Sequence, residues 1–162
     1  MATSPQGGTP VTPIGLDGKV IGAGVDGATQ PSASNPTPVS VGPYPANATA
    51  IIAGSGVVAA AAAVATLDSD PVKTTYIAGL LIAGGGATAA ALVDVTIAGL
   101  LGGTQTIVHG AVAGATAKNP DVVVYFDPPL PASAAGVDIV VTCPSLGAGN
   151  AKNSVTAWGY KL

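Results

Sequence analysis

From about residue 50 onward, apolar residues come in short runs that Gly, Pro, Asn or Asp interrupt at regular intervals. Runs of this length, rich in β-branched residues and bounded by turn formers, are typical of strands. The clearest alternation is at 92–97, where Val93, Val95 and Ile97 share one face and Asp94 points the other way. The pattern predicts seven strands, at roughly 56–67, 74–83, 90–100, 105–113, 121–127, 136–143 and 153–161.

The run VVAAAAAVATL at residues 57–67 is the one segment in which a helix competes seriously with a strand. Its five consecutive alanines favour a helix locally. The β-branched residues around them, and the glycines in front of the run, favour a buried strand. A strand is therefore predicted, and the chain from residue 49 to 162 is expected to form an antiparallel β-sandwich of the all-β class.

The stretch IAGGGATAAALVDV, residues 82–95, has the G-x-G-x-x-A spacing of a dinucleotide-binding turn. Such a site needs a helix after the glycines and an acidic residue roughly 20 positions further on. A strand pattern follows instead, and no acidic residue occurs between Asp94 and Asp121. No cofactor is therefore expected, and Gly84–Gly86 are predicted to form the turn of a hairpin that joins two strands.

Residues 1–48 contain most of the prolines and no long apolar run. Proline fixes φ and lacks an N–H group, so this segment is predicted to be an extended N-terminal arm in front of the sandwich domain. Within the arm, two valines could add an edge strand to a partner sheet while a tyrosine fills a pocket. The candidate partner-contact residues are Pro36, Pro38, Val39, Val41, Pro43 and Tyr44.

Charge and composition exclude several classes of function. The net charge is −3 and the five lysines form no cluster, so no nucleic-acid partner is expected. Residues 74–93 carry no charge, but charged residues make up only 8% of the chain, and this window is rich in Gly, Ala and Thr, so no membrane span is expected. The single cysteine, Cys143, excludes an internal disulfide and is expected to be a small buried apolar residue on a strand.

Candidate chemistry is sparse. His109, the only histidine, lies among apolar residues and is expected to be a structural or a surface residue, with no catalytic role. Asp68 and Asp70 offer too few oxygens for calcium, and a turn ended by Pro71 is predicted there. No catalytic residue or metal site is predicted, so the chain is expected not to be an enzyme. The late aromatic residues are expected to be core or interface anchors: Tyr125, Phe126, Trp158 and Tyr160.

The C-terminal stretch FDPPLPASAAGVDIVVTCPSLGAGNAKNSVTAWGY, residues 126–160, resembles the end of small virion proteins encoded by tailed bacteriophages. KTTYIAGLLIAGGGATAAALVDVTIAGL, residues 73–100, resembles the corresponding pair of strands, and NPTPVSVGPYP extends the likeness back to about residue 35. The resemblance implies a jelly-roll-like sandwich, and a capsid cement (decoration) protein on the capsid surface with the major capsid protein as partner. The alternative is a tail or fibre protein, or a sandwich module that binds a surface glycan or receptor.

Self-association is expected on separate grounds. Strands such as VVVYF at 122–126 are apolar on both faces, so a monomer would expose apolar patches that soluble monomers avoid. A homo-oligomer is therefore predicted. The resemblance to cement proteins implies that it is a trimer.

Overall fold

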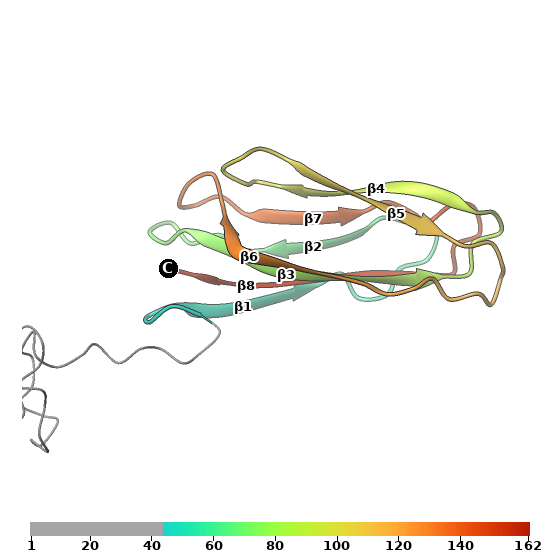
Figure 1. Cartoon of the computed structure of the whole chain (residues 1–162), viewed down its shortest axis with the longest axis horizontal. Helices are drawn as coiled ribbons and strands as arrows, with labels where there is room; N and C mark the ends of the chain where they lie inside the picture. The colour runs from blue at the N-terminus through green and yellow to red at the C-terminus, as the bar shows by residue number, and fades with distance from the viewer. Residues whose placement is uncertain (1–43) are drawn as a thin grey trace, which may run out of the picture. The chain divides into compact units, whose positions relative to one another are not determined.

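A computed structural model describes residues 44–162, which form two packed antiparallel sheets of four strands each and contain no helix (Figure 1). The predicted antiparallel β-sandwich is therefore confirmed. No helix in residues 44–162 is long and apolar enough to cross a membrane. The strands are β1 (Thr49–Gly54), β2 (Ala63–Leu67), β3 (Thr75–Gly85), β4 (Ala91–Ala98), β5 (Gln105–Ala111), β6 (Val122–Pro131), β7 (Ile139–Cys143) and β8 (Lys152–Lys161).

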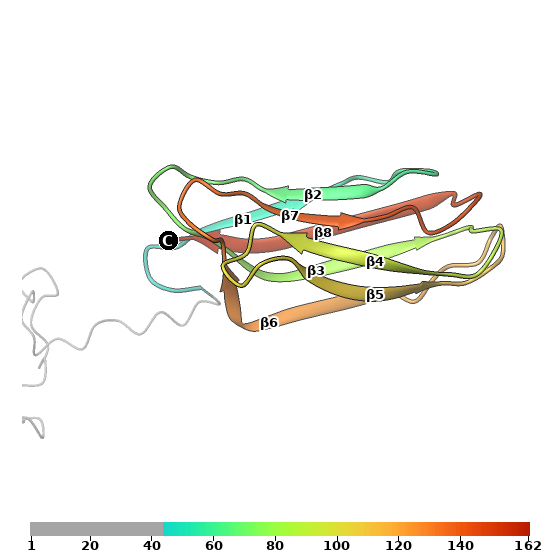
Figure 2. The same cartoon turned by 90° about the horizontal axis from the view of Figure 1, so that it is seen from above.

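The strand order is β1-β8-β3-β6 in one sheet and β2-β7-β4-β5 in the other. Among consecutive strands only β4 and β5 share a sheet, so most connections cross from one layer to the other. Seen from above, β5 and β6 run along the same side of the sandwich (Figure 2). The edge strands are therefore β1 and β6 in one layer and β2 and β5 in the other.

The predicted strand at 56–67 is wrong in its first half, and β1 was not predicted. Only Ala63–Leu67 pairs as a strand, whereas 57–62 bends, with Ala60 at a φ of 49°. The bend is held by main-chain bonds to distant residues, since Val58 N donates to Asn153 O and Ala60 N to Asn150 O, both at 2.9 Å. These tertiary bonds override the local pattern of the alanine run.

The prediction of a hairpin turn at Gly84–Gly86 is also wrong. Gly84 and Gly85 continue β3 and pair with β8, and β3 and β4 belong to different sheets. A Cβ at Gly85 would lie only 2.3 Å from the carbonyl oxygen of Ala117, so the glycine is needed because a loop packs directly on the strand. Only Gly86, with a φ of 82°, turns the chain toward the other layer.

Several strand ends differ from the prediction by one or two residues, and the ends of two strands, β6 and β7, differ by more. β6 runs on to Pro131 through Pro128 and Pro129, which an edge strand tolerates because its outer side needs no N–H donors. β7 begins at Ile139 rather than at residue 136, because residues 133–136 form a bend and turn.

The core lies between the two sheets and is built from alternate residues of each strand. As predicted, Val95 and Ile97 of β4 are buried while Leu92 and Asp94 are exposed. The largest fully buried apolar side chains are Leu67, Ile77, Leu80, Ile82, Ile97, Ile139, Leu146, Val95, Val141 and Val155.

Candidate functional site

The outer face of the β1-β8-β3-β6 sheet carries a row of large apolar side chains. The register pairs Ile52 of β1 with Trp158 of β8, and Trp158 and Tyr125 with Gly79 of β3. Directly paired residues point to the same side of a sheet. The next row adds further apolar side chains, because Leu81 pairs with Val123. We call this surface the aromatic face: Ile52, Leu81, Val123, Tyr125 and Trp158.

The aromatic face is exposed and rigidly built. Ile52 and Tyr125 are each 74% exposed. The indole of Trp158 lies over Gly79, where a Cβ would approach its Cζ2 to 2.5 Å, and the ring meets Tyr125 edge-on at 5.7 Å. A glycine beneath an aromatic ring lets that ring lie against the sheet, so the position of Trp158 is determined by backbone contact.

Three tyrosines extend the same outer surface along β8. Tyr160 stacks on Tyr76 with ring centroids 4.9 Å apart, and Tyr44 tilts against Tyr160 at 5.2 Å. The structure thus places the ring of Tyr44, a sequence-predicted contact residue, against its own sheet. The other candidates, Pro36, Pro38, Val39, Val41 and Pro43, lie outside the described residues.

The outer face of the β2-β7-β4-β5 sheet mixes polar side chains with the exposed apolar side chains of Val64, Leu92 and Val108. Thr142 pairs with Val64 and with Thr96, which in turn pairs with Thr106, so hydroxyl groups line its central row. Asp94 is exposed on the same face. The two outer faces therefore differ, and the contact surface richest in aromatic groups is on the β1-β8-β3-β6 side.

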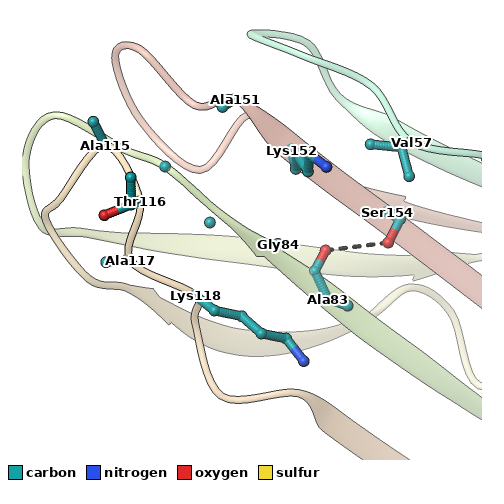
Figure 3. Close-up of a pocket in the computed structure, with 12 residues that line it drawn as sticks. Val57, Ala83, Gly84, Ala115, Thr116, Ala117, Lys118, Ala151, Lys152 and Ser154 are labelled. Atoms are coloured by element: carbon teal, nitrogen blue, oxygen red, sulfur yellow. Dashed lines mark hydrogen bonds between the residues drawn. The ribbon is translucent and has the colours of Figure 1, made fainter.

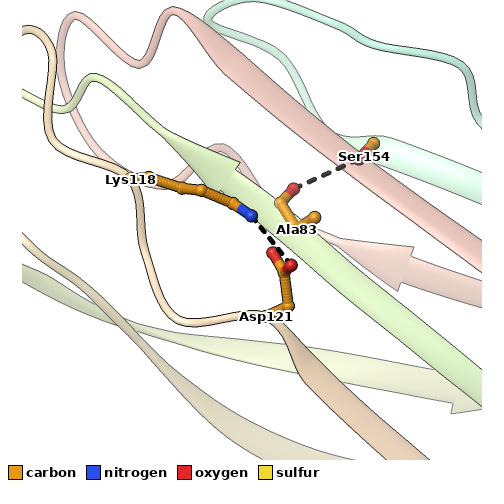
Figure 4. A network of polar contacts seen from close by, with 4 residues as sticks. All are labelled: Ala83, Lys118, Asp121 and Ser154. Atoms are coloured by element: carbon orange, nitrogen blue, oxygen red, sulfur yellow. Dashed lines mark hydrogen bonds and ion pairs between the residues drawn. The ribbon is translucent and has the colours of Figure 1, made fainter.

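A hollow of about 430 Å³ lies over the ends of β3 and β8, where the loop at 115–118 forms one wall (Figure 3). Glycine backbone and alanine methyl groups make up most of its lining. Lys118 forms an exposed ion pair with Asp121 at 2.8 Å, and Ser154 donates to the Ala83 carbonyl (Figure 4). Exposed pairs of this kind contribute about 0–1 kcal/mol. The lining contains no acid, histidine or cysteine that could act as a base or nucleophile.

Buried asparagines, which were not predicted from the sequence, hold the loops at this end of the sandwich. The side-chain nitrogen of Asn153 donates to the carbonyls of Ala61, Cys143 and Pro144, at 3.4, 3.2 and 3.0 Å. Asn119 accepts a bond from Val112 N at 2.9 Å. Polar residues in the turn-like sequences NAKN and KNP were the available signal, but their partners lie seven to ten residues away along the chain or, for Ala61, 92 residues away.

His109 and Cys143 are both buried, as a structural role requires. His109 is 3% exposed and points into the sandwich from β5; burial lowers its pKa. Cys143 is completely buried on β7, as predicted, and burial raises the pKa of its thiol. Within residues 44–162, no group of three or more His, Cys, Asp or Glu side chains could hold a metal ion.

The predicted turn at Asp68–Asp70 is displaced, because residues 68–70 are irregular and the chain bends at residues 71–73. Asp70 Oδ1 accepts a bond from Val72 N at 2.9 Å, which closes the turn around Pro71. Ser69 N donates to Asp138 Oδ1 at 2.6 Å, and hydrogen bonding to Ser69 lowers the pKa of this carboxyl. These carboxylates hold loops together.

An apolar groove of about 400 Å³ opens between the edge strands β5 and β6. Ile107 of β5 faces Val124 and Phe126 of β6 across it, and no charged side chain lines it. The described part of the chain therefore offers two uncharged contact surfaces, the aromatic face and this groove.

Comparison with known proteins finds no matching family model, no similar curated protein and no similar solved structure.

Proposed function

We propose that this chain is a non-enzymatic virion structural protein of a tailed bacteriophage, a capsid cement protein that binds and stabilises the assembled shell. The observation that carries the proposal is the aromatic face. Tyr125 and Ile52 are exposed on a regular sheet surface, where apolar area in contact with water is unfavourable unless a partner covers it. Tyr and Trp are also enriched in protein interfaces.

The fold supports the same proposal. β1 pairs with β8, β2 with β7, β3 with β6 and β4 with β5. This nested pairing is what an eight-stranded hairpin gives when it folds over into two sheets, and we propose that the sandwich is a jelly roll. Eight-stranded jelly rolls occur in viral capsid domains and in lectins.

A glycan-binding module is the second candidate, because the exposed ring of Tyr125 lies beside Trp158. A sugar also needs closely placed polar groups to fix its hydroxyls. The neighbouring members of the aromatic face, Ile52, Leu81 and Val123, supply none, and Thr156, which pairs with Leu81, adds a single hydroxyl group. Contact with a protein surface fits this face better.

The first test is the number of copies in the virion. A cement protein is expected in hundreds of copies on the capsid surface, whereas a few copies would indicate a tail or fibre protein. Absence from the particle would refute the proposal.

The second test is binding to purified shells that lack the protein. The double variant Ile52→Ser/Tyr125→Ser should bind at least about tenfold more weakly, since exposed aromatic anchors carry much of an interface's free energy. Val64→Ser/Leu92→Ser is the matched control, because it removes exposed apolar side chains from the opposite outer face. Equal binding by both variants and the wild type would exclude the aromatic face as the contact.

A further inference from the structure

β5 is an edge strand without the features that usually protect a sheet edge. Among the described strands it pairs only with β4. Its seven residues, QTIVHGA, include no proline and no charged side chain. An edge strand presents backbone N–H and C=O groups that can pair with another chain, and native edges are usually blocked by charges, prolines or bulges. β5 is therefore open to strand addition.

Of the other three edges, β6 is blocked, and β1 and β2 are shorter than β5. β6 is preceded by Asp121, contains Asp127 and ends in a segment with three prolines. β1 and β2 also contain no charge or proline, but they are shorter edges, with six and five residues, and the apolar groove opens beside β5 and β6. Within residues 44–162, β5 is thus the long edge that remains unprotected.

The groove beside β5 indicates what kind of strand can be added. Its lining combines Ile97, Leu100 and Ile107 with Val124, Phe126 and Leu130 from β6 and the adjoining segments. Its polar side chains, Gln105 and Thr106, are uncharged. A charged segment would lose its hydration here without gaining a partner, so the added strand must be uncharged, as β5 itself is.

We propose that β5 pairs antiparallel with β5 of a second copy about a two-fold axis, joining two β2-β7-β4-β5 sheets into one. Val108 is the middle residue of the strand, so a pairing centred on it engages all seven residues and places Ile107 opposite His109 of the other copy. A two-fold contact uses the same patch on both copies, and it must therefore be complementary to itself. An uncharged strand next to an apolar groove meets this condition.

Charge does not oppose the contact, although each chain carries a net charge of −3. The acidic residue beside the axis is Asp94, which pairs with Val108 within the sheet. In the joined sheet the two copies of Asp94 are separated by three strand spacings, roughly 14 Å. This exceeds the screening length of about 8 Å at physiological ionic strength.

Pairing through β5 predicts that the protein forms dimers, in place of the trimer implied by the resemblance. The proposal does not depend on the proposed function.

Cysteine cross-linking of the full chain tests the pairing directly. Paired Cα atoms of antiparallel strands are about 4.5–5.5 Å apart, within the range of about 4.4–6.8 Å that a disulfide spans. In a Cys143→Ala background, Val108→Cys should form a covalent dimer under mild oxidation. Val64→Cys is the matched control, because Val64 is an exposed valine on the same outer face but on the other edge strand. No dimer with Val108→Cys, or an equal yield from both variants, would overturn the proposal.

Sedimentation at micromolar concentration gives an independent measurement. The wild type should be a dimer, and Val108→Glu should raise the dimer dissociation constant by about tenfold or more, since it places two carboxylates at the axis. Val64→Glu should leave the constant unchanged, with circular dichroism verifying that both variants fold. A wild-type monomer, a trimer, or equal weakening by both variants would contradict pairing through β5.

Discussion

At the scale of single residues, Gly79 shows how the aromatic face depends on a missing side chain. A Cβ here would lie 2.5 Å from Trp158 Cζ2 and 2.7 Å from the Val124 carbonyl oxygen. Gly79→Ala should therefore displace the indole and lower the free energy of unfolding by about 1–3 kcal/mol. Urea unfolding followed by the fluorescence of Trp158, the only tryptophan, measures both effects.

Gly54→Ala is the matched control for Gly79→Ala. Gly54 is also a strand glycine, but its added Cβ would meet Thr156 Oγ1 at an ordinary 3.6 Å. The free energy of unfolding of the Gly54→Ala variant should stay within about 0.5 kcal/mol of the wild-type value, as is usual for surface substitutions. Equal losses in the two variants would show that the packing of Trp158 is not what requires Gly79.

His109 makes the free energy of unfolding depend on pH. Burial lowers its pKa below the ordinary value of 6.5, so the unfolded chain binds a proton more readily than the folded protein. Stability is therefore complete above pH 6.5 and falls as the pH drops below 6.5 toward the folded-state pKa. His109→Leu should flatten the curve of unfolding free energy between pH 7.5 and 5.5. Parallel curves for the variant and the wild type would contradict this, because the chain has no other histidine.

At the scale of elements, the start of β8 is joined to the loops by one amide. Asn153→Asp keeps the shape of the side chain but removes the donor that serves three carbonyl groups and adds a buried charge. The expected loss is about 2 kcal/mol or more at pH 7 by urea unfolding, because groups left without partners are costly. Asn47→Asp, at an exposed turn position, should have little effect. Similar stability of the two variants would exclude Asn153 as the joining residue.

At the scale of the whole molecule, the described strands and the predicted N-terminal arm occupy different parts of the chain, so the arm can be removed without cutting a described strand. Every strand in residues 44–162 begins at or after Thr49. A chain that begins at Tyr44 keeps the contact between Tyr44 and Tyr160. Its free energy of unfolding should therefore lie within about 1 kcal/mol of that of the full chain. Its binding to shells that lack the protein should nevertheless weaken by about tenfold or more, since the arm is predicted to make contacts with the shell in addition to those of the aromatic face. Undiminished binding would assign the contact to the sandwich.

The local sequence determined the class of fold and the inner and outer sides of most strands. The alternation at 92–97 specifies which residues of β4 are buried, because successive side chains of a strand point to opposite faces. The same alternation excluded a dinucleotide site at residues 82–95. The apolar run around Cys143 predicted its burial, whereas the sequence left open whether His109 is structural or at the surface.

The tertiary structure decided which strands are neighbours. It therefore also decided which residues come together in the aromatic face and in the groove. A period of two gives the face of a residue but not its partner strand, so Gly84–Gly86 read as a hairpin although β3 and β4 lie in different sheets. The aromatic face combines Ile52, Tyr125 and Trp158 from strands up to about a hundred residues apart. The groove exists only because β5 and β6 end their sheets on the same side. Pairing between distant strands is selected by the packing of the whole core, which no local stretch of the sequence contains.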